Sequence, residues 1–213
     1  MFFLARPKVV FVHIQKTAGS SIRKALFHHG QATDQQNEMG SIGYWHAPAS
    51  LGIKLLGHDR WCEFRSFAVV RNPWERLVSW WTMAHVQGRH HRIRRQATAS
   101  FASYVYDLGS FHAFLAAGDV CYHDSDGWRW PFCPQVNYIS GPDGQIVVDH
   151  ILRFERLDQD WPTFCGTVGL PPTPLEVTNA TPHAPYRDYY TPETRDLVAE
   201  KFAPDIAQFG YEY

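Results

Sequence analysis

The sequence predicts an α/β fold in which a parallel β-sheet is flanked by helices, within a single domain. Two short apolar, β-branched runs, at residues 8–14 and 65–70, are each followed by a polar turn and then by apolar residues at helical spacing. Runs that are apolar on both faces are typical of strands buried in a parallel sheet. The length of 213 residues is enough for one domain with a substantial core of its own.

The first run leads into a small, polar turn over residues 15–21, which contains Gly19 and precedes the first predicted helix. The buried face of that helix is predicted from three apolar residues at helical spacing, Ile22, Leu26 and Phe27. Residues 31–60 contain the breakers Gly40, Gly43, Pro48 and Gly52, so we expect an irregular connection there.

The second run, Arg65–Val70, is predicted as a strand, and Arg71-Asn72-Pro73 as the turn at its end. We expect a helix over Trp74–Val86, because a proline in the first turn of a helix costs no hydrogen bond. Its predicted core face consists of Leu77, Val78, Trp81 and Ala84. Residues 87–133 are then expected to form a mostly helical insert.

Downstream of the insert, strand-like segments occur at 146–148 and 151–154, and helical spacing resumes over 157–168. The last helix is expected to begin at Pro192, after an N-cap at Thr191. Its predicted buried face consists of Leu197, Val198 and Phe202.

The charges almost balance, with 20 Lys and Arg against 21 Asp and Glu and a formal net charge of −1. A general nucleic-acid-binding protein is normally more basic, so we expect no nucleic acid as a partner and only a local anion site. No apolar run approaches the roughly 18 residues that cross a bilayer, and the N-terminus lacks the pattern of a signal peptide. We therefore expect a cytoplasmic protein, unless an N-terminal membrane anchor precedes this sequence in the natural chain.

The cysteines, at positions 62, 121, 133 and 165, show neither CxxC pairing nor the spacing of metal ligands. No metal site is predicted. Two interpretations of the thiols are open: all four are free, or Cys121 and Cys133 form a disulfide.

The turn 15–21 places Lys16 and several small residues at the start of a helix. Free N–H groups and the helix dipole favour an anion there, and the lysine adds a full positive charge. The turn is similar to a nucleotide P-loop, but GxxxxGK[ST] requires glycine before the lysine, where this chain has Phe11–Gln15. An ATPase or GTPase is therefore disfavoured, and the plainer alternative is an ordinary helix cap with a surface lysine.

Arg71 stands at the end of the second predicted strand, and Ser79 follows in the next helix. Ligands of α/β proteins collect at the carboxyl ends of the strands, so we expect Arg71 to face the same crevice as Lys16. Two such motifs suit a ligand with two separate anionic groups. Arg76 could also reach this crevice, but an exposed arginine paired with Glu75 or with solvent is the favoured interpretation.

The segments HIQKTAGSS at 13–21 and FAVVRNPWERLVSWW at 67–81 together resemble the two cofactor signatures of sulfotransferases that use 3′-phosphoadenosine 5′-phosphosulfate (PAPS). The closest likeness is to the carbohydrate branch of the heparan/chondroitin 2-O/6-O type, whose usual forms are HIPKTGGTS and FVRNPYDRLVS. The likeness continues in two downstream segments, 143–157 and 175–213. The departures, Gln15 for Pro and Ala18 for Gly, remove neither a charge nor a hydrogen-bond donor.

This resemblance implies a P-loop-like sheet, PAPS as donor, its desulfated product PAP, and a carbohydrate hydroxyl as acceptor. Carried over by motif, the residues that would hold the 5′-phosphosulfate are Lys16, Thr17, Ala18, Gly19 and Ser20, with Ser21 adjacent. Lys16 would also be catalytic, by stabilising charge on the bridging oxygen. The 3′-phosphate would be held by Arg71 and Ser79. The C-terminal loop Asn179–Arg187 would close over the nucleotide, with Tyr186 and Arg187, together with Asn179, as the residues that bind it.

The acceptor hydroxyl must lose a proton, and a histidine, which titrates near neutral pH, suits this task. Among the 12 histidines, we select His46, because it lies between the two signatures, where related sugar sulfotransferases carry a histidine in a similar context. His58 is the main rival. His13 is expected to be a buried, hydrogen-bonded residue of the first strand. Those expected to be surface or substrate contacts are His85, His90 and His91.

A dense basic cluster follows the second helix and consists of Arg89, His90, His91, Arg92, Arg94 and Arg95. Two interpretations are open: it binds an anionic glycan, or it is a solvated helix face. On the first, we assign Arg89 and Arg92 to the acceptor site, together with Trp45, whose ring could stack on a sugar.

Two other functions are weighed against a carbohydrate sulfotransferase. A nucleotide kinase would keep the α/β fold and the phosphate turn, but it would require magnesium-dependent ATP turnover. A non-catalytic protein could bind a nucleotide or a glycan on the same scaffold. The oligomeric state is open, because the aromatic insert suits a dimer contact as well as a glycan groove.

Overall fold

The computed structural model describes the chain except for residues 33–38, 42–44, 95–99, 119–120, 125–126 and 179. The chain forms two compact units. The first consists of Met1–Arg71 and Gln135–Asn179, and the second of Asn72–Pro134 and Ala180–Tyr213.

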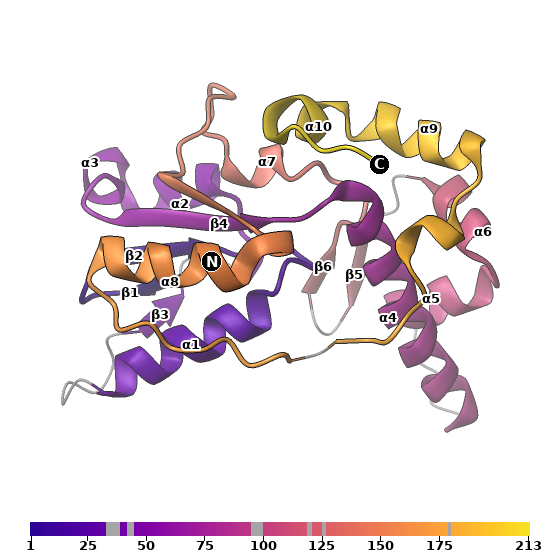
Figure 1. Cartoon of the computed structure of the whole chain (residues 1–213), viewed down its shortest axis with the longest axis horizontal. Helices are drawn as coiled ribbons and strands as arrows, with labels where there is room; N and C mark the ends of the chain where they lie inside the picture. Colours follow the sequence, from indigo (N-terminus) through magenta and orange to yellow (C-terminus); the bar gives the residue numbers. More distant parts are fainter. Residues whose placement is uncertain (33–38, 42–44, 95–99, 119–120, 125–126, 179) are drawn as a thin grey trace. The chain divides into compact units, whose positions relative to one another are not determined.

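The first unit contains a five-stranded sheet of order β3-β1-β2-β4-β7 (Figure 1). The strands are β1 (Phe2–Leu4), β2 (Val9–Val12), β3 (Met39–Ser41), β4 (Arg65–Val70) and β7 (His150–Arg153). β2, β4 and β7 are parallel neighbours, whereas β1 pairs antiparallel with both β2 and β3. The sheet is therefore mixed, and its parallel part contains the two predicted buried strands together with β7, which overlaps the predicted strand-like segment 151–154.

Two features of the sheet differ from the prediction. The antiparallel strands β1 and β3 were not predicted, because three residues are too few to show a period. The strand-like segment 146–148 is no strand; Ile146 makes only an isolated bridge with Ser140, and the last strand is β7.

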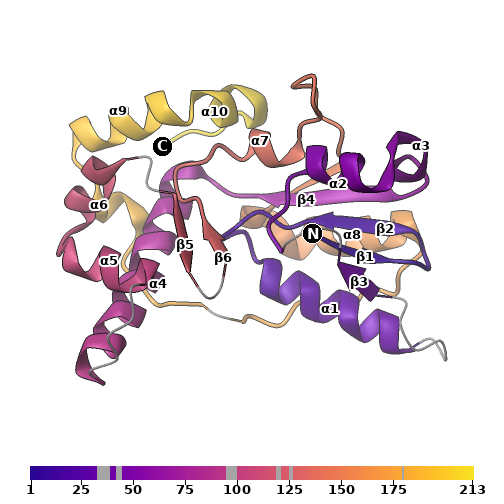
Figure 2. The same ribbon diagram turned by 180° about the vertical axis from the view of Figure 1, so that it is seen from behind.

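Helices α1 (Gly19–Ala32) and α8 (Leu157–Val168) pack on one face of this sheet. The Phe67 ring lies 4.8 Å from that of Phe11 and 4.2 Å from that of Phe164 of α8. The predicted α1 face is confirmed for Ile22 and Leu26, but Phe27 is 49% exposed. Figure 2 shows the other side of the unit, with α2 (Ala49–Leu56) and α3 (His58–Trp61).

The prediction that residues 31–60 are irregular is wrong for α2 and α3. Gly52 lies inside α2 and is buried there. A Cβ at Gly52 would lie 2.7 Å from both Met1 and Trp61. This glycine therefore permits close packing of a helix instead of breaking the chain, which the sequence pattern could not distinguish. The unit is completed by α7 (Val136–Ile139) and the 3₁₀ turn η1 (Phe154–Arg156).

The second unit is mostly helical. Its elements are α4 (Pro73–Ile93), α5 (Phe101–Asp107), α6 (Phe111–Ala117), the hairpin β5 (Tyr122–Asp124) and β6 (Gly127–Arg129), η2 (Tyr186–Tyr189), α9 (Pro192–Lys201) and α10 (Ala203–Phe209). The expectation of a mostly helical insert agrees with α5 and α6, but the short hairpin was not foreseen.

Helix α4 begins at Pro73, because the Asn72 side chain accepts hydrogen bonds from the N–H groups of Trp74 and Glu75. It runs to Ile93, beyond the predicted end. Gly88 allows α5 to lie against this extension, since a Cβ there would be 2.2 Å from the Ala102 carbonyl oxygen (Figure 1).

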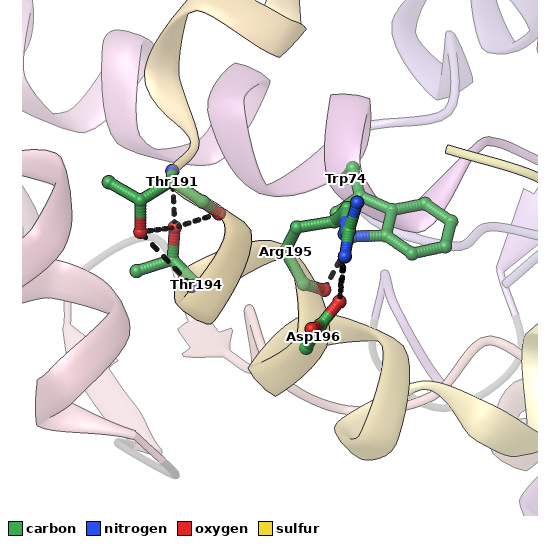
Figure 3. Close-up of polar contacts among 5 residues, drawn as sticks. All are labelled: Trp74, Thr191, Thr194, Arg195 and Asp196. Atoms are coloured by element: carbon green, nitrogen blue, oxygen red, sulfur yellow. Dashed lines mark hydrogen bonds and ion pairs between the residues drawn. The ribbon is translucent and has the colours of Figure 1, made fainter.

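The predicted start of the last helix is confirmed (Figure 3). Thr191 accepts a hydrogen bond from the Thr194 N–H, the Thr194 hydroxyl lies 2.9 Å from the Thr191 nitrogen, and Pro192 takes the first position. The Trp74 indole N–H donates to the Arg195 carbonyl at 3.0 Å and joins α9 to α4. Val198 is buried as predicted, but Leu197 is 47% exposed.

Within the described parts of the chain, no helix is both long enough and apolar enough to span a membrane.

Candidate active site

The turn between β2 and α1 has an unusual backbone. Lys16 and Ala18 adopt positive φ angles of 69° and 64°, and Thr17 between them does not. Alternation of this kind turns successive N–H groups toward one side and forms a concave anion-binding nest. The helix that follows at Gly19 adds its own free N–H groups. The backbone of this turn is therefore shaped for an anion.

The hydroxyl side chains of the turn differ in their burial and in their hydrogen-bond partners. The Thr17 hydroxyl is buried and donates to the Ile14 carbonyl at 2.9 Å, so only the Thr17 backbone N–H remains for a ligand. Ser21 is also buried, and its hydroxyl lies 3.1 Å from that of Thr178. Ser20 is half-buried. The Ser21 hydroxyl therefore has a structural partner, whether or not it also meets a ligand.

His13 explains the glycine at position 19. Its ring is stacked on Phe11 at 5.3 Å and lies so close to the start of α1 that a Cβ on Gly19 would be 1.6 Å from Nε2. His13 is buried as predicted, but its Nδ1 has no hydrogen-bond partner among the described residues. Burial, and next the charge of His46, lower the pKa of His13 well below its usual range. His13 is therefore neutral in the folded protein at neutral pH.

Arg71 reaches this turn, as its place at the end of a parallel strand predicts. Its Nη1 donates to the Lys16 carbonyl at 3.2 Å, and its guanidinium carbon lies 4.0 Å from the centre of the Phe154 ring. The reason is topological: β2 and β4 are parallel neighbours, so their carboxyl ends lie at the same edge. Two cationic residues, Lys16 and Arg71, thus follow the carboxyl ends of adjacent strands at one edge of the sheet.

Gln135 holds the backbone of Arg71, a role that its sequence context does not indicate. Its Oε1 accepts from the Arg71 N–H and its Nε2 donates to the Arg71 carbonyl, both at 2.8 Å, and the side chain is fully buried. A lone glutamine in a Pro-rich segment carries no local signal of this role, because its partner lies 64 residues away in the chain.

His46 lies beside the anion turn. Its Nδ1 is 3.0 Å from the carbonyl oxygen of His13, and the two imidazole rings are 4.3 Å apart. A carbonyl can only accept, so Nδ1 carries the proton and the neutral ring has its lone pair on Nε2. The structure therefore gives His46 the tautomer that a general base requires. The rival His58 is exposed in α3, with its Nε2 3.6 Å from the Cys62 sulfur.

The other residues predicted to bind the donor lie elsewhere in the chain. Ser79 is half-buried in α4, and Tyr186 and Arg187 form the start of η2, all in the second unit. The Arg187 guanidinium carbon lies 5.1 Å from the centre of the Tyr186 ring. Asn179 is outside the described residues. Their approach to the donor stays a prediction.

Arg76 contradicts the favoured interpretation of an exposed arginine. It is fully buried, and its Nη2 donates to the carbonyl oxygens of Pro131 and Cys133 at 3.0 and 2.7 Å. Its guanidinium carbon also lies 5.6 Å from the centre of the Phe202 ring. Arg76 therefore fixes the end of the insert and is part of the second unit's core.

Two residues of the basic cluster contact other residues of the second unit. Arg92 pairs with Asp107 of α5 through both Nε and Nη2, and His91 Nδ1 lies 3.3 Å from the Ser100 hydroxyl. Arg89 is exposed on α4, and Arg95 lies outside the described residues. The Arg92 side chain thus has a structural partner, whether or not it also meets a glycan.

All four cysteines are free thiols, so the alternative of a disulfide between Cys121 and Cys133 is wrong. Cys165 is buried in the core of the first unit, and burial raises the pKa of its thiol to about 11. The described residues contain no group of His, Cys, Asp or Glu side chains that could hold a metal ion.

The site described above combines a nest-shaped turn, two cationic residues at one sheet edge and a histidine of defined tautomer. A comparison of the chain with protein families gives a result that fits this combination. The family model described as the sulfotransferase family matches residues 1–212. The chain belongs to the sulfotransferase family. No curated protein and no solved structure matches it significantly. Membership in this family supports an enzyme that transfers a sulfuryl group.

Proposed function

We propose that this sulfotransferase takes the sulfuryl group from PAPS and transfers it to a carbohydrate hydroxyl. The observation that carries the proposal is the 3.2 Å contact between Arg71 Nη1 and the carbonyl of Lys16. It joins two cationic residues at the ends of adjacent parallel strands. A donor with two separate anionic groups, such as PAPS, suits this pair and the nest of N–H groups beside it.

In the proposed reaction, PAPS supplies the sulfuryl group and a phosphate leaving group. Lys16 and the N–H groups of the turn stabilise negative charge on the bridging oxygen as its bond to sulfur breaks. His46 Nε2 accepts the proton of the acceptor hydroxyl while that oxygen bonds to sulfur. Arg71 holds the 3′-phosphate, and its contact with Phe154 orients the guanidinium in advance.

Calorimetric titration with PAP, in EDTA and with ATP as the comparison, tests the donor. We expect micromolar or tighter binding of PAP that is indifferent to metal and much stronger than that of ATP. Weak PAP binding together with magnesium-dependent ATP binding would favour the nucleotide kinase instead. Binding of neither ligand would contradict both enzyme hypotheses.

Variants locate the donor site. Lys16→Ala and Arg71→Ala should each weaken PAP binding about tenfold or more, because each removes a charge-assisted contact. Lys54→Ala and Arg60→Ala, on exposed positions of α2 and α3, are the matched controls and should leave it unchanged. The site assignment is wrong if Lys16→Ala and Arg71→Ala also leave it unchanged.

Ser79 is tested in the same titration. Ser79→Ala should cost less PAP affinity than Arg71→Ala, since it removes a neutral hydrogen bond and no charge. An undiminished affinity in Ser79→Ala would remove Ser79 from the donor site and leave Arg71 in it.

A further inference from the structure

The imidazole of His13 is a buried polar group that has no role in the reaction proposed above. His13 directly follows β2 and is 7% exposed. The rings of Phe2, Phe11 and His46 lie 6.0, 5.3 and 4.3 Å from its own. Nδ1 is buried without a hydrogen-bond partner among the described residues, and Nε2 has none there either. Because native proteins rarely leave a buried polar group unpaired, this imidazole calls for a ligand.

The two nitrogens of the His13 ring differ in their surroundings. In a neutral imidazole one nitrogen carries the proton and the other has a lone pair. Buried N–H groups without an acceptor are rarer in proteins than unused lone pairs, so the enclosed Nδ1 has the lone pair and Nε2 carries the proton. Burial keeps the ring neutral by lowering the pKa of His13. Nε2–H is therefore a neutral donor in a fixed position.

This donor lies at the anion turn. Among the His13 atoms, Nε2 is the nearest to the place that a Cβ on Gly19 would take, at 1.6 Å. Gly19 is the first residue of α1, a helix of 14 residues, and directly follows the positive φ angles of Lys16 and Ala18. The free N–H groups of this backbone favour an anion. An anion bound by the turn is thus a partner within reach of Nε2–H.

His13 also contacts the proposed base. Its carbonyl oxygen lies 3.0 Å from His46 Nδ1, and the two rings are 4.3 Å apart. The two imidazoles have opposite tautomers, since His46 has its lone pair on Nε2 and His13 has its proton there. One ring can accept a proton while its neighbour donates a hydrogen bond, a division of roles that is common where two titratable groups share an active site.

From this arrangement we propose that His13 binds the sulfuryl donor, with Nε2–H donating a hydrogen bond to an oxygen of the 5′-phosphosulfate. The assignment rests on the proposed function, because it takes PAPS from that reaction. As the bond between sulfur and the bridging oxygen breaks, negative charge grows on the leaving phosphate, and a fixed neutral dipole stabilises it. The proton of His13 stays on Nε2 throughout. The proton of the acceptor hydroxyl goes to His46.

Two ligands that differ in one group test this contact: PAP, which has the 5′-phosphate, and adenosine 3′-phosphate, which lacks it. Their affinities for the full chain are measured by calorimetric titration and displacement. His13→Asn carries its amide only as far as Nδ1, whereas His13→Gln carries an N–H donor as far as Nε2. We expect His13→Asn to weaken PAP about tenfold and His13→Gln to stay within about threefold of the natural chain. Neither change should alter the affinity for adenosine 3′-phosphate.

His13→Phe keeps an aromatic ring over Gly19 but has no donor, so it should lose as much PAP affinity as His13→Asn. The matched control is His150→Phe, at the start of β7, whose ring lies 5.4 Å from that of Phe164. It lies at the end of the parallel strands opposite to the anion turn and should leave both affinities unchanged.

The proposal is overturned if His13→Phe and His13→Asn bind PAP as tightly as the natural chain does. It is also overturned if they weaken PAP and adenosine 3′-phosphate equally, because that result would show a purely structural role. Binding of PAP to the natural chain separates the two levels. If PAP binds and these variants do not discriminate between the two ligands, only the role of His13 fails; if PAP does not bind at all, the proposed function fails as well.

Discussion

The side-chain amide of Gln135 pairs with both backbone polar groups of Arg71, at 2.8 Å in each direction. This pairing continues the hydrogen bonding of a strand beyond the end of β4, by means of a side chain. It fixes the backbone from which the Arg71 side chain reaches the Lys16 carbonyl. Gln135 is therefore a positioning residue for a cation of the proposed donor site.

Gln135→Ala should weaken PAP binding about tenfold, because Arg71 would lose its fixed backbone, and should also lower the free energy of unfolding. Each buried backbone group left unpaired costs about 1–3 kcal/mol. Titration calorimetry and urea denaturation measure the two effects. Gln145→Ala, at an exposed position, is the control. A loss of stability with unchanged PAP affinity would make the role of Gln135 purely structural.

His46→Ala should lower the sulfuryl-transfer rate by about 10²-fold or more, the usual size of a general-base effect, with little change in PAP affinity. The reason is that, in the proposed reaction, Nε2 takes the proton of the acceptor hydroxyl and has no role in holding the donor. Single-turnover assays with an accepted glycan, together with PAP titration, separate the two quantities. His58→Ala is the matched control, and an equal loss of rate in that variant would contradict the choice of base.

Removing the methyl group of Ala18 should raise the free energy of unfolding, whereas adding a methyl group at Gly19 should lower it. Ala18 holds a φ of 64°, so Ala18→Gly relieves strain and should stabilise the fold by up to ~1 kcal/mol after the added chain entropy is deducted. Gly19→Ala should destabilise it by ~1–3 kcal/mol or more, because the new Cβ would meet the His13 ring. Urea denaturation measures the free energy of unfolding of both variants. A change of the same sign in Ala18→Gly and Gly19→Ala would contradict this prediction.

Stability should fall as the pH drops below about 6.5. The pKa of His13 is lowered on folding, so below the unfolded value of 6.5 the unfolded chain binds a proton that the folded protein does not. The contribution of His13 to the free energy of unfolding is complete above pH 6.5. Below that pH it is lost at up to about 1.4 kcal/mol per pH unit. His29 acts in the same direction, since burial and then His28 lower its pKa.

The measurement is urea denaturation between pH 7.5 and pH 5 for the natural sequence and for His13→Phe, which keeps an aromatic ring over Gly19. The variant should show a shallower slope. His58→Gln serves as the control at an exposed position. An unchanged slope in His13→Phe would show that other groups cause the acid sensitivity.

Much of the first unit could be predicted, because its signals are local. The apolar run Arg65–Val70 forms β4 with the predicted bounds, and 157–168 forms α8 as predicted. The composition of the turn 15–21 predicted an anion site, and the structure gives its backbone the positive φ angles at Lys16 and Ala18 that suit an anion. The proximity of Arg71 to Lys16 followed from a topological rule that holds for any pair of adjacent parallel strands.

The sequence by itself therefore determined the α/β class, the start of α9 at Pro192 and the candidate site residues, since each depends on neighbours within a few positions. Only the tertiary structure decided what polar residues do when buried. Arg76 binds carbonyls at 131 and 133, Gln135 binds the backbone at 71, and His46 binds the carbonyl at 13. A buried polar group must find a hydrogen-bond partner, and folding, not local pattern, determines which distant residue provides it.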